Sequence, residues 1–431
     1  MSLPRKAVAA SSRAGRARQP AHEDDRAAVS GGLPSGGPDT QVPRLKPVHP
    51  FPARMAPEIA FSQMKPLPPG SLILDPMVGS GTTVRVATEL GHRALGFDLD
   101  PLAVLMSRVW TTPVSHQALI DSAAELVEAA KALGKVELPW IDEDSRTTQF
   151  VNFWFADKQR RQLRKIAYLL NAMQGPLADA LRIALSRIII TKKGGASLAW
   201  DTSHSRPHRV ADDNDFDVYE GFARSAAYLA KLFEKQPPKG GATILLGDAR
   251  SLHATEDGLA DAVITSPPYL NAISYLRGHR LSLVWLGYKA GESFRLNGSG
   301  MTEEQAGSPA HEVLEHMLRE MGETDHLPPS EQRVIKRYAA DLQAIVRETA
   351  RVLKQGGKAI YVIGDSCLRG VRISNSTALR VAALGAGLKL DREYRREIPP
   401  NRRYLPPPTH LRGSPLEKRM RWEHVLVFDR P

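Results

Sequence analysis

The chain has 431 residues, of which 42% are hydrophobic, so it can bury a sizeable core and is longer than one simple domain requires. Its net charge of +11 favours a polyanionic partner, and nucleic acid is the class we expect. The single cysteine, Cys367, excludes a disulfide framework and a cysteine-rich metal site, and no apolar run approaches the ~18 residues of a membrane-spanning helix. We therefore expect a cytoplasmic protein with no membrane association.

The N-terminal segment differs in composition from the rest of the chain. Residues 1–43 are rich in Ala, Arg, Ser, Gly and Pro and carry few large apolar side chains. Such a segment cannot bury enough apolar surface to fold, so we expect a disordered basic tail. A folded domain is predicted to begin with the segment that contains His49-Pro50-Phe51-Pro52-Ala53.

The next elements predict a parallel βαβ unit. Residues 71–75 indicate a buried strand, 78–81 a tight glycine turn, 82–90 a helix closed by Gly91, and 93–98 a second strand. Asp100 suits the N-cap of a further helix, and Pro101 suits its first position. Strand, helix and strand in this order are typical of a sheet with parallel strands.

From residue 111 to residue 240 the pattern becomes helical, and we interpret this stretch as a helical insertion. Strands resume at 243–248 and 259–264, a helix is expected over 338–353, and a strand over 359–363 after Gly356-Gly357. Two last segments, 388–398 and 422–428, predict an antiparallel hairpin. Residues 44–110 and 241–431 thus predict one α/β domain. The helices expected within the insertion are 121–133, 156–173, 176–190 and 216–233.

The most informative motif is Thr265-Ser266-Pro267-Pro268-Tyr269, directly after a predicted strand. Two consecutive prolines fix φ and donate no backbone hydrogen bond, so they hold the carbonyls of Ser266 and Pro267 rigid at the strand end. Free acceptors beside an aromatic ring suit the amino group of a flat base that stacks on Tyr269. A proline-rich turn with an ordinary tyrosine has the same residues, and the rest of the chain decides between the two.

Three other features predict a nucleoside-type ligand. The turn Val78-Gly79-Ser80-Gly81 allows close approach to the backbone, although a plain tight turn would look the same. Asp98 ends the next strand, where an acid accepts both hydroxyls of a ribose. Asp248 ends a third strand and is placed to accept from an adenine amino group, or else to cap the next helix.

Together these motifs resemble the S-adenosylmethionine-dependent DNA amino-methyltransferases of the N4-cytosine and N6-adenine type. The resemblance rests on residues 75–83, Asp98, Asp248 and residues 266–269, with further likeness at 49–53 and 352–358. It covers about 46–110 and 241–431. It implies a Rossmann-like methyltransferase fold with a seven-stranded, mostly parallel sheet. It also implies that S-adenosylmethionine lies at the carboxyl ends of the strands.

The resemblance assigns a role to each matching residue. Phe51 flanks the methionine end of the cofactor, Asp75 lies near its amino group, Asp98 binds the ribose and Asp248 the adenine. The residues implied around the methionine and ribose are Pro76, Gly79, Ser80, Gly81 and Thr82. Those implied to hold the target base are Ser266, Pro267, Pro268 and Tyr269.

The implied reaction is methyl transfer to the exocyclic amino group of a flipped base, without a metal. Ser266, preceded by Thr265, resembles the N4-cytosine members, and N6-adenine is the alternative. A C5-cytosine mechanism needs a thiolate nucleophile, and Cys367 lacks the preceding proline of that class. Methylation of RNA or of a protein glutamine, and a catalytically silent nucleic-acid binder, remain as other hypotheses.

The expected partner is double-stranded DNA in the nucleoid, together with a cognate restriction endonuclease. Because nothing of size follows the final strand, we expect target recognition in the helical insertion 111–240 or in residues 287–333. Arg160, Arg161 and Arg164 are expected on the DNA phosphates. Residues 394–396 and 401–404 are expected to line the base channel. Four histidines show no metal-binding spacing and are expected at the surface: His204, His208, His279 and His311.

Overall fold

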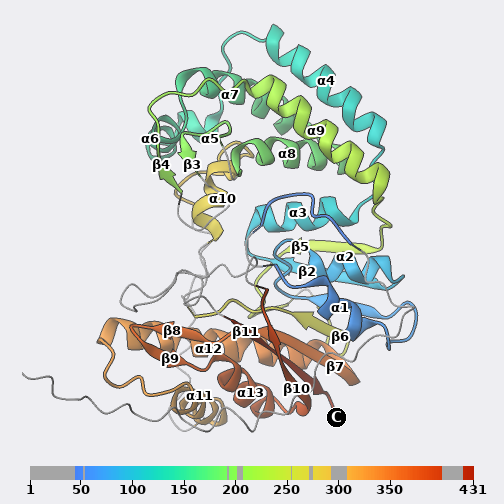
Figure 1. Cartoon of the computed structure of the whole chain (residues 1–431), viewed down its shortest axis with the longest axis vertical. Helices are drawn as coiled ribbons and strands as arrows, with labels where there is room; N and C mark the ends of the chain where they lie inside the picture. Colours follow the sequence, from blue (N-terminus) through green and yellow to red (C-terminus); the bar gives the residue numbers. More distant parts are fainter. Residues whose placement is uncertain are drawn as a thin grey trace, which may run out of the picture.

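The computed structural model describes residues 44–51, 54–191, 194–200, 207–253, 255–270, 275–292, 308–399 and 421–431. At its centre lies a seven-stranded sheet in the order β10-β11-β7-β6-β1-β2-β5 (Figure 1). The strands of this sheet are β1 (Leu72–Asp75), β2 (Arg93–Asp98), β5 (Ala242–Leu246), β6 (Ala260–Thr265), β7 (Leu353–Ile363), β10 (Lys389–Glu397) and β11 (Trp422–Asp429).

The strand directions confirm the predicted fold class. Strands β5, β2, β1, β6 and β7 pair in parallel, whereas β11 runs antiparallel between β7 and β10. The chain order reverses between β1 and β6, because β2 and β5 extend the sheet on one side and β7 on the other. In open α/β sheets, ligands bind outside the carboxyl ends of the strands at such a switch point. Asp75 ends β1 and Thr265 ends β6, so both lie at this point.

Both faces of the sheet are covered by helices, as expected for parallel strands. Side chains alternate along each strand. Ile73 and Ile360 face a core formed with α1 (Pro57–Met64) and α2 (Thr82–Glu89). Leu74 and Tyr361 face a second core that includes α11 (Pro309–Glu320), α12 (Pro329–Val352) and α13 (Asn375–Gly385). The result is a three-layer α/β domain.

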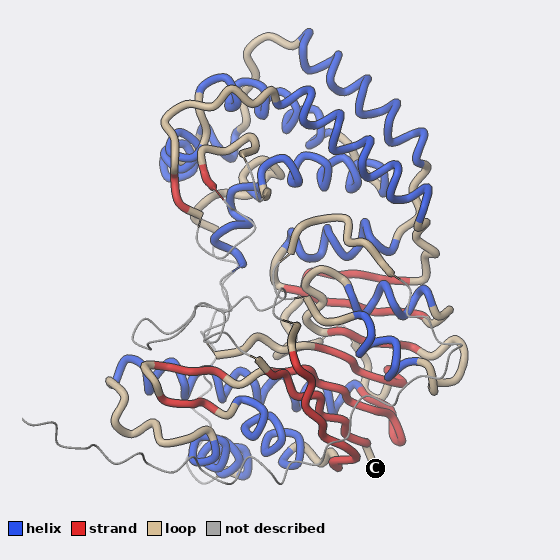
Figure 2. Tube along the Cα trace, viewed as in Figure 1, coloured by secondary structure: helices blue, strands red, loops and turns tan. Residues whose placement is uncertain are grey.

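A separate helical layer lies above this domain in Figures 1 and 2. Its apolar core also takes in α3 (Pro101–Thr111) from below and α10 (Tyr275–Leu283), which follows the Ser-Pro-Pro-Tyr segment. The insertion therefore has its own core, joined to the sheet through α3. Its elements are α4 (His116–Ala132), α5 (Pro139–Asp142), α6 (Ser145–Trp154), α7 (Asp157–Ala172), α8 (Pro176–Ile189), β3 (Ala199–Trp200), β4 (His208–Arg209) and α9 (Val218–Lys235).

Several element boundaries differ from the sequence prediction. Helix α12 begins at Pro329, nine residues before the predicted start at residue 338, because a proline fits the first helical turn. Strand β7 begins at Leu353 and runs through Gly356 and Gly357, where the sequence suggested the end of the preceding helix. Helices α1, α6, α11 and α13 and the hairpin of β8 (Ser366–Leu368) and β9 (Val371–Ile373) were not predicted.

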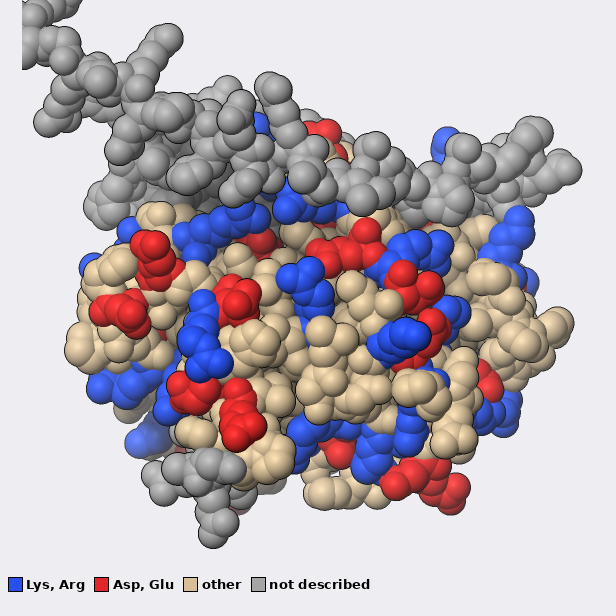
Figure 3. Space-filling model, turned by 90° about the horizontal axis from the view of Figure 1, so that it is seen from below, with Lys and Arg blue, Asp and Glu red and all other residues tan. Residues whose placement is uncertain are grey.

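Some predictions fall on residues that the structure does not describe. They concern the tail 1–43, the pair Pro52-Ala53, His204, and the segment 401–404. On the face of the molecule shown in Figure 3, basic and acidic side chains are intermixed. Within the described ranges, no helix combines the length and the apolar character needed to cross a bilayer.

Candidate active site

The glycine turn between β1 and α2 has a backbone that only glycine adopts easily. Gly79 and Gly81 have φ of 50° and 88°, in the left-handed region. A Cβ on Gly81 would lie 2.8 Å from the Ser107 hydroxyl oxygen, and one on Gly79 would lie 3.4 Å from the Phe51 ring. The turn is therefore packed directly between α3 and Phe51. Phe51 thus lies beside Gly79, and its role at the methionine end of the cofactor stays a prediction.

Two acids at the ends of β1 and β2 flank this turn. Asp98 accepts hydrogen bonds from the backbone N–H groups of Gly79 and Asp100, each at 2.9 Å, and thereby ties β2 to the turn. Asp75 is 3% exposed and accepts from the Met77 N–H at 3.1 Å. Burial raises the pKa of Asp75 to about 6. Burial, together with the charge of Asp100, raises the pKa of Asp98 to about 7.

The Ser-Pro-Pro-Tyr segment is fixed beside this turn by its neighbours. The Thr265 hydroxyl donates to Asp75 Oδ1 at 2.7 Å, which joins the end of β6 to the end of β1. The Ser266 hydroxyl donates to the carbonyl of Val362 on β7 at 2.9 Å. On the far side of the motif, the Ser366 hydroxyl donates to the Leu270 carbonyl at 2.5 Å. The segment is thus held from β1, β7 and β8.

The four motif residues differ in exposure. Pro267 is buried and Pro268 is exposed, while Ser266 and Tyr269 are half-buried. Tyr269 packs against the core beneath α12, where the neighbouring Tyr338 has a pKa raised by burial and by the nearby Tyr269. Because the Ser266 hydroxyl proton is donated to the Val362 carbonyl, the lone pairs of Ser266 Oγ can accept a hydrogen bond from another group.

His279 on α10 is a site residue that the sequence did not reveal. It is 3% exposed, so its expected surface position is wrong. Its Nδ1 donates to the carboxylate of Asp100, the N-cap of α3, and its ring centroid lies 5.7 Å from that of Phe51. The only signal in the sequence was the position of His279 shortly after the motif. Burial is caused by long-range packing of α10 onto α3 and α8, which periodicity does not reveal.

The N-terminal motif is anchored to the helical layer. His49 is buried, its Nδ1 donates to the Pro50 carbonyl at 2.7 Å, and its Nε2 accepts from the Ser186 hydroxyl of α8 at 2.8 Å. Burial is the main reason why the pKa of His49 is lowered to about 3, so the imidazole is neutral. This fixed, uncharged residue holds the chain that leads into Phe51.

Asp248 follows β5 and is already engaged within the protein. Its carboxylate accepts from the Arg250 guanidinium, with the shortest contact 2.7 Å, and Arg250 also binds Asp341 at 2.8 Å. The hydrogen bonds from Arg250 oppose the effect of burial, and the pKa of Asp248 is below its usual range. Asp248 is therefore ionised near neutral pH. Its contact with adenine stays a prediction.

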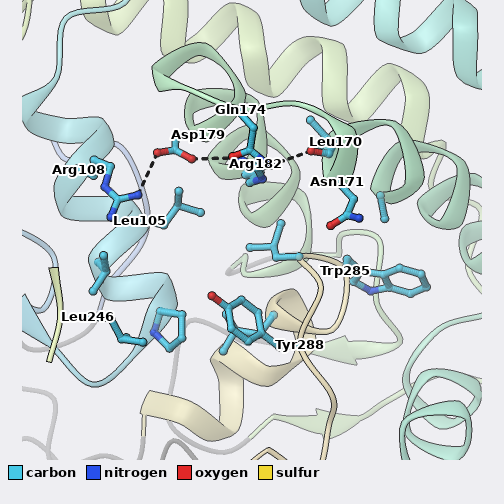
Figure 4. A pocket seen from close by; sticks show the side chains of 15 residues that line it. Leu105, Arg108, Leu170, Asn171, Gln174, Asp179, Arg182, Leu246, Trp285 and Tyr288 are labelled. Carbon is cyan, nitrogen blue, oxygen red and sulfur yellow. Dashed lines mark hydrogen bonds and ion pairs between the residues drawn. The ribbon is translucent and has the colours of Figure 1, made fainter. Parts of the chain in front are cut away.

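A pocket of about 310 Å³ lies beside the site, between α3, α7, α8 and the segment 283–288 (Figure 4). Arg108 on α3 binds Asp179 on α8 at 3.4 Å, and Asp179 in turn binds Arg182 at 3.1 Å. The residues that line the pocket include Pro101 and Leu246, but none of the residues predicted to bind the cofactor or the base. The pocket thus marks the junction between the helical layer and the sheet, not the place where the two motifs meet.

The three arginines expected on DNA phosphates are paired with acids of the protein. Arg160 and Arg161 both bind Asp157, and Arg164 binds Asp142 in a bidentate pair at 2.7 and 2.9 Å. The partly buried, bidentate Arg164–Asp142 pair leaves little free charge for a phosphate, whereas the Asp157 side chain is 70% exposed and a phosphate can replace it more easily. Among the described residues, no group of three or more His, Cys, Asp or Glu side chains is arranged to hold a metal ion.

Comparison with known proteins places these motifs in a family. Residues 48–107, which include Phe51, the glycine turn and Asp98, match the family model described as DNA methylase, of the N6/N4 type. These matches support the DNA amino-methyltransferase family. Its members use S-adenosylmethionine, and DNA is their substrate.

The chain is similar over most of its length to two named Type II methyltransferases. It is 22% identical to M.MvaI of Kocuria varians over 75% of this chain and 78% of that protein. It is 23% identical to M.AvaI of Anabaena variabilis over 74% of this chain and 73% of that protein. Among solved structures, it is similar to a TehB-like SAM-dependent methyltransferase from Corynebacterium glutamicum, with 11% identity, a TM-score of 0.30, and 88% and 89% of the two chains covered.

The residues at the carboxyl ends of β1 and β2 suit S-adenosylmethionine. Asp75 and Asp98 supply carboxylates for an ammonium group and for ribose hydroxyls. The Thr82 hydroxyl oxygen at the start of α2 is buried and has no hydrogen-bond partner within the described part of the chain. A polar ligand in the turn would provide that partner. The donor set therefore fits the cofactor.

Proposed function

We propose that this protein is a site-specific DNA methyltransferase that modifies the N4 amino group of a cytosine flipped out of the duplex. The observation that carries the proposal is the hydrogen bond from Thr265 to Asp75. It brings the predicted base-binding segment and the predicted cofactor turn together at the switch point of the sheet. The Type II designation of M.MvaI and M.AvaI supports a DNA substrate that is modified at a defined sequence.

The proposed residue roles follow from the chemistry of an aromatic amine. When bound, S-adenosylmethionine supplies an electrophilic methyl group. The amine is a poor nucleophile because its lone pair is delocalised into the ring. Ser266 Oγ and the Pro267 carbonyl accept its N–H groups, which favours a pyramidal nitrogen and stabilises the positive charge that develops on it. Tyr269 stacks on the base, and the prolines keep both acceptors in fixed positions.

The choice of cytosine rests on Ser266, since the N4-cytosine members of the family resemble this chain at that position. A neutral serine is a weaker acceptor than the carboxylate or amide that is more common in adenine enzymes. The hydrogen bond from Ser266 to Val362 supports this role, because it orients the hydroxyl proton away from the substrate. A DNA substrate would also place the protein on the nucleoid and allow a cognate restriction endonuclease as partner.

Mass analysis of nucleosides tests the proposal. Duplex DNA and transfer RNA are each incubated with the protein and isotopically labelled S-adenosylmethionine, then digested to nucleosides. We expect labelled N4-methylcytosine. Labelled N6-methyladenine would show that the target base is adenine and not cytosine, and the other proposed residue roles would stand. Labelled transfer RNA together with unlabelled DNA would overturn the DNA proposal.

A further inference from the structure

We propose that the exposed face of α6, with the adjoining strand β4, reads the target sequence in the major groove of DNA. This inference rests on the proposed function and deepens it by assigning the surface that selects the sequence. Helix α6 was not predicted from the sequence. It lies within the insertion that was expected to recognise the target, but none of its residues was singled out there.

The side chains on this face have the chemistry of base recognition. Arg146, Gln149, Asn152 and Phe153 are exposed. Gln149 follows Arg146 by three residues, and Asn152 and Phe153 follow Gln149 by three and four, so the four side chains share one broad face of the helix. Arginine pairs with guanine, glutamine and asparagine with adenine, and an aromatic ring packs against the thymine methyl group. Within the described residues, the side chains of Gln149 and Asn152 have no hydrogen-bond partner.

Charge distinguishes α6 from its neighbours. Among the helices described between residues 116 and 235, α6 alone contains no Asp or Glu. Helix α4, by contrast, carries Asp121, Glu125 and Glu128, which DNA phosphates would repel. Of the acids that precede α6, Asp142 binds Arg164 and Asp144 caps the helix through Thr147, whereas Glu143 is exposed.

The hairpin of β3 and β4 extends the same surface. The Leu198 N–H next to β3 donates to the Trp154 carbonyl at the end of α6, at 2.8 Å. The guanidinium of Arg209 lies 5.2 Å from the centroid of the Phe153 ring, which is 49% exposed. Arg209 pairs with Asp212 at 3.0 Å, but Asp212 is almost fully exposed, so a DNA phosphate can replace it at low cost.

Helix α6 is also connected to the base-binding segment. The Ala290 N–H donates to the buried Thr147 hydroxyl of α6 at 2.9 Å, and Phe155 packs edge-on against Trp285 at 5.1 Å. Ala290 and Trp285 belong to the stretch that continues from the Ser-Pro-Pro-Tyr segment through α10. In Figure 1, α6, β4 and α10 lie on the side of the molecule where β7 ends, which is the carboxyl end of the parallel strands. A duplex read by α6 therefore lies on the side where Tyr269 would receive the base.

The test compares alanine variants on the cognate duplex and on duplexes with an altered base pair. The sequence methylated by the wild-type protein is first mapped on plasmid DNA. The ratio kcat/KM is then measured on that cognate duplex and on duplexes with one base pair changed. Gln149→Ala, Asn152→Ala and Phe153→Ala are compared with Gln117→Ala and Ile120→Ala, two exposed positions on α4. Calorimetric binding of S-adenosylmethionine shows whether each variant keeps its fold and its cofactor site.

We expect at least one α6 variant to lose about tenfold of its preference for the cognate duplex at one particular base pair, with unchanged cofactor affinity. The α4 variants should keep the wild-type preference. If all three α6 variants discriminate within about twofold of wild type, this surface does not read the sequence. That failure differs from a failure of the proposed function, in which the wild-type protein itself would methylate no DNA.

Discussion

The Thr265 hydroxyl donates a hydrogen bond of 2.7 Å to the carboxylate of Asp75, across the boundary between two neighbouring parallel strands. Thr265 precedes the proposed base-binding segment, and Asp75 begins the proposed cofactor turn. Replacement of Thr265 by valine keeps the shape and removes the donor. We expect cofactor binding to weaken by about five- to tenfold, because Asp75 loses a bond that stabilises its ionised form.

Isothermal titration with S-adenosylhomocysteine measures this effect. Thr111→Val is the matched control, since Thr111 is also a buried threonine, and its hydroxyl donates to the Ser107 carbonyl at 2.8 Å within α3. Equal affinities for Thr265→Val and wild type would mean that the bond does not support the cofactor site.

The raised pKa values predict how stability depends on pH. Asp75 and Asp98 have pKa values of about 6 and about 7, against 3.8 for an ordinary aspartate. At a pH between the unfolded and the folded pKa of each aspartate, the folded protein retains a proton that the unfolded chain has lost. The free energy of unfolding contributed by these groups therefore falls as pH rises from about 4 to about 7. In the proposed roles, bound cofactor would supply an ammonium group to Asp75 and ribose hydroxyl donors to Asp98. We therefore expect the cofactor to raise Tm more at about pH 8 than at about pH 6.

Thermal unfolding with and without S-adenosylhomocysteine across this pH range provides the measurement. Asp98→Asn is the variant of choice, because it removes one of the titrating groups and should reduce the pH dependence of the shift. A cofactor-induced shift that is larger at the lower pH would contradict the assignment of these two acids.

Replacement of Gly81 is expected to destabilise the fold severely. Alanine at this position meets a φ of 88° and would place its Cβ 2.8 Å from Ser107 Oγ and 2.9 Å from Ser107 Cα. We expect Gly81→Ala to lower the free energy of unfolding by at least about 2 kcal/mol and to abolish cofactor binding. Gly91 separates the two causes, since its φ is 78° and a Cβ added there would meet no atom within 4 Å.

Denaturant unfolding of both variants gives the comparison. Gly91→Ala should lose only about 1–2 kcal/mol, the cost of a left-handed backbone alone, and should bind cofactor normally. Similar losses in the two variants would show that contact with Ser107 does not constrain the turn.

His279 is expected to act as a positioning residue for Phe51 and Asp100. His279→Ala should raise the KM for S-adenosylmethionine by about tenfold with a smaller effect on kcat, because the loss lies in the cofactor site. His279→Asn keeps a donor for Asp100 and should recover part of the affinity. His316→Ala, an exposed histidine of α11, is the control. A fall in kcat with unchanged KM would contradict this role.

The sequence allowed the sheet and the principal motifs to be predicted because their signals are local. The turn at Gly79 and Gly81 and the strand before Ser266 are recognisable from adjacent residues. The resemblance of the combined motifs then supplied the expected strand arrangement. That arrangement is confirmed, including the antiparallel position of β11. The roles of the individual site residues stay predictions.

The features that escaped prediction depend on contacts between distant segments. Arg164 looked available for DNA, but its partner Asp142 lies 22 residues earlier in the chain. His279 is buried because α10 packs onto α3 and α8, and α6 is fixed by contacts with Trp285 and Ala290. None of these pairings has a local periodic signature.

The central claim is that the Ser-Pro-Pro-Tyr segment holds the base for methyl transfer without binding the cofactor. Single-turnover methylation of a cognate duplex by Tyr269→Ala and Ser266→Ala, combined with calorimetric cofactor titration, tests it most directly. We predict that both variants bind S-adenosylmethionine with wild-type affinity and lose methyl transfer by a factor of about 100 or more. Methyl transfer at the wild-type rate in either variant would contradict the claim.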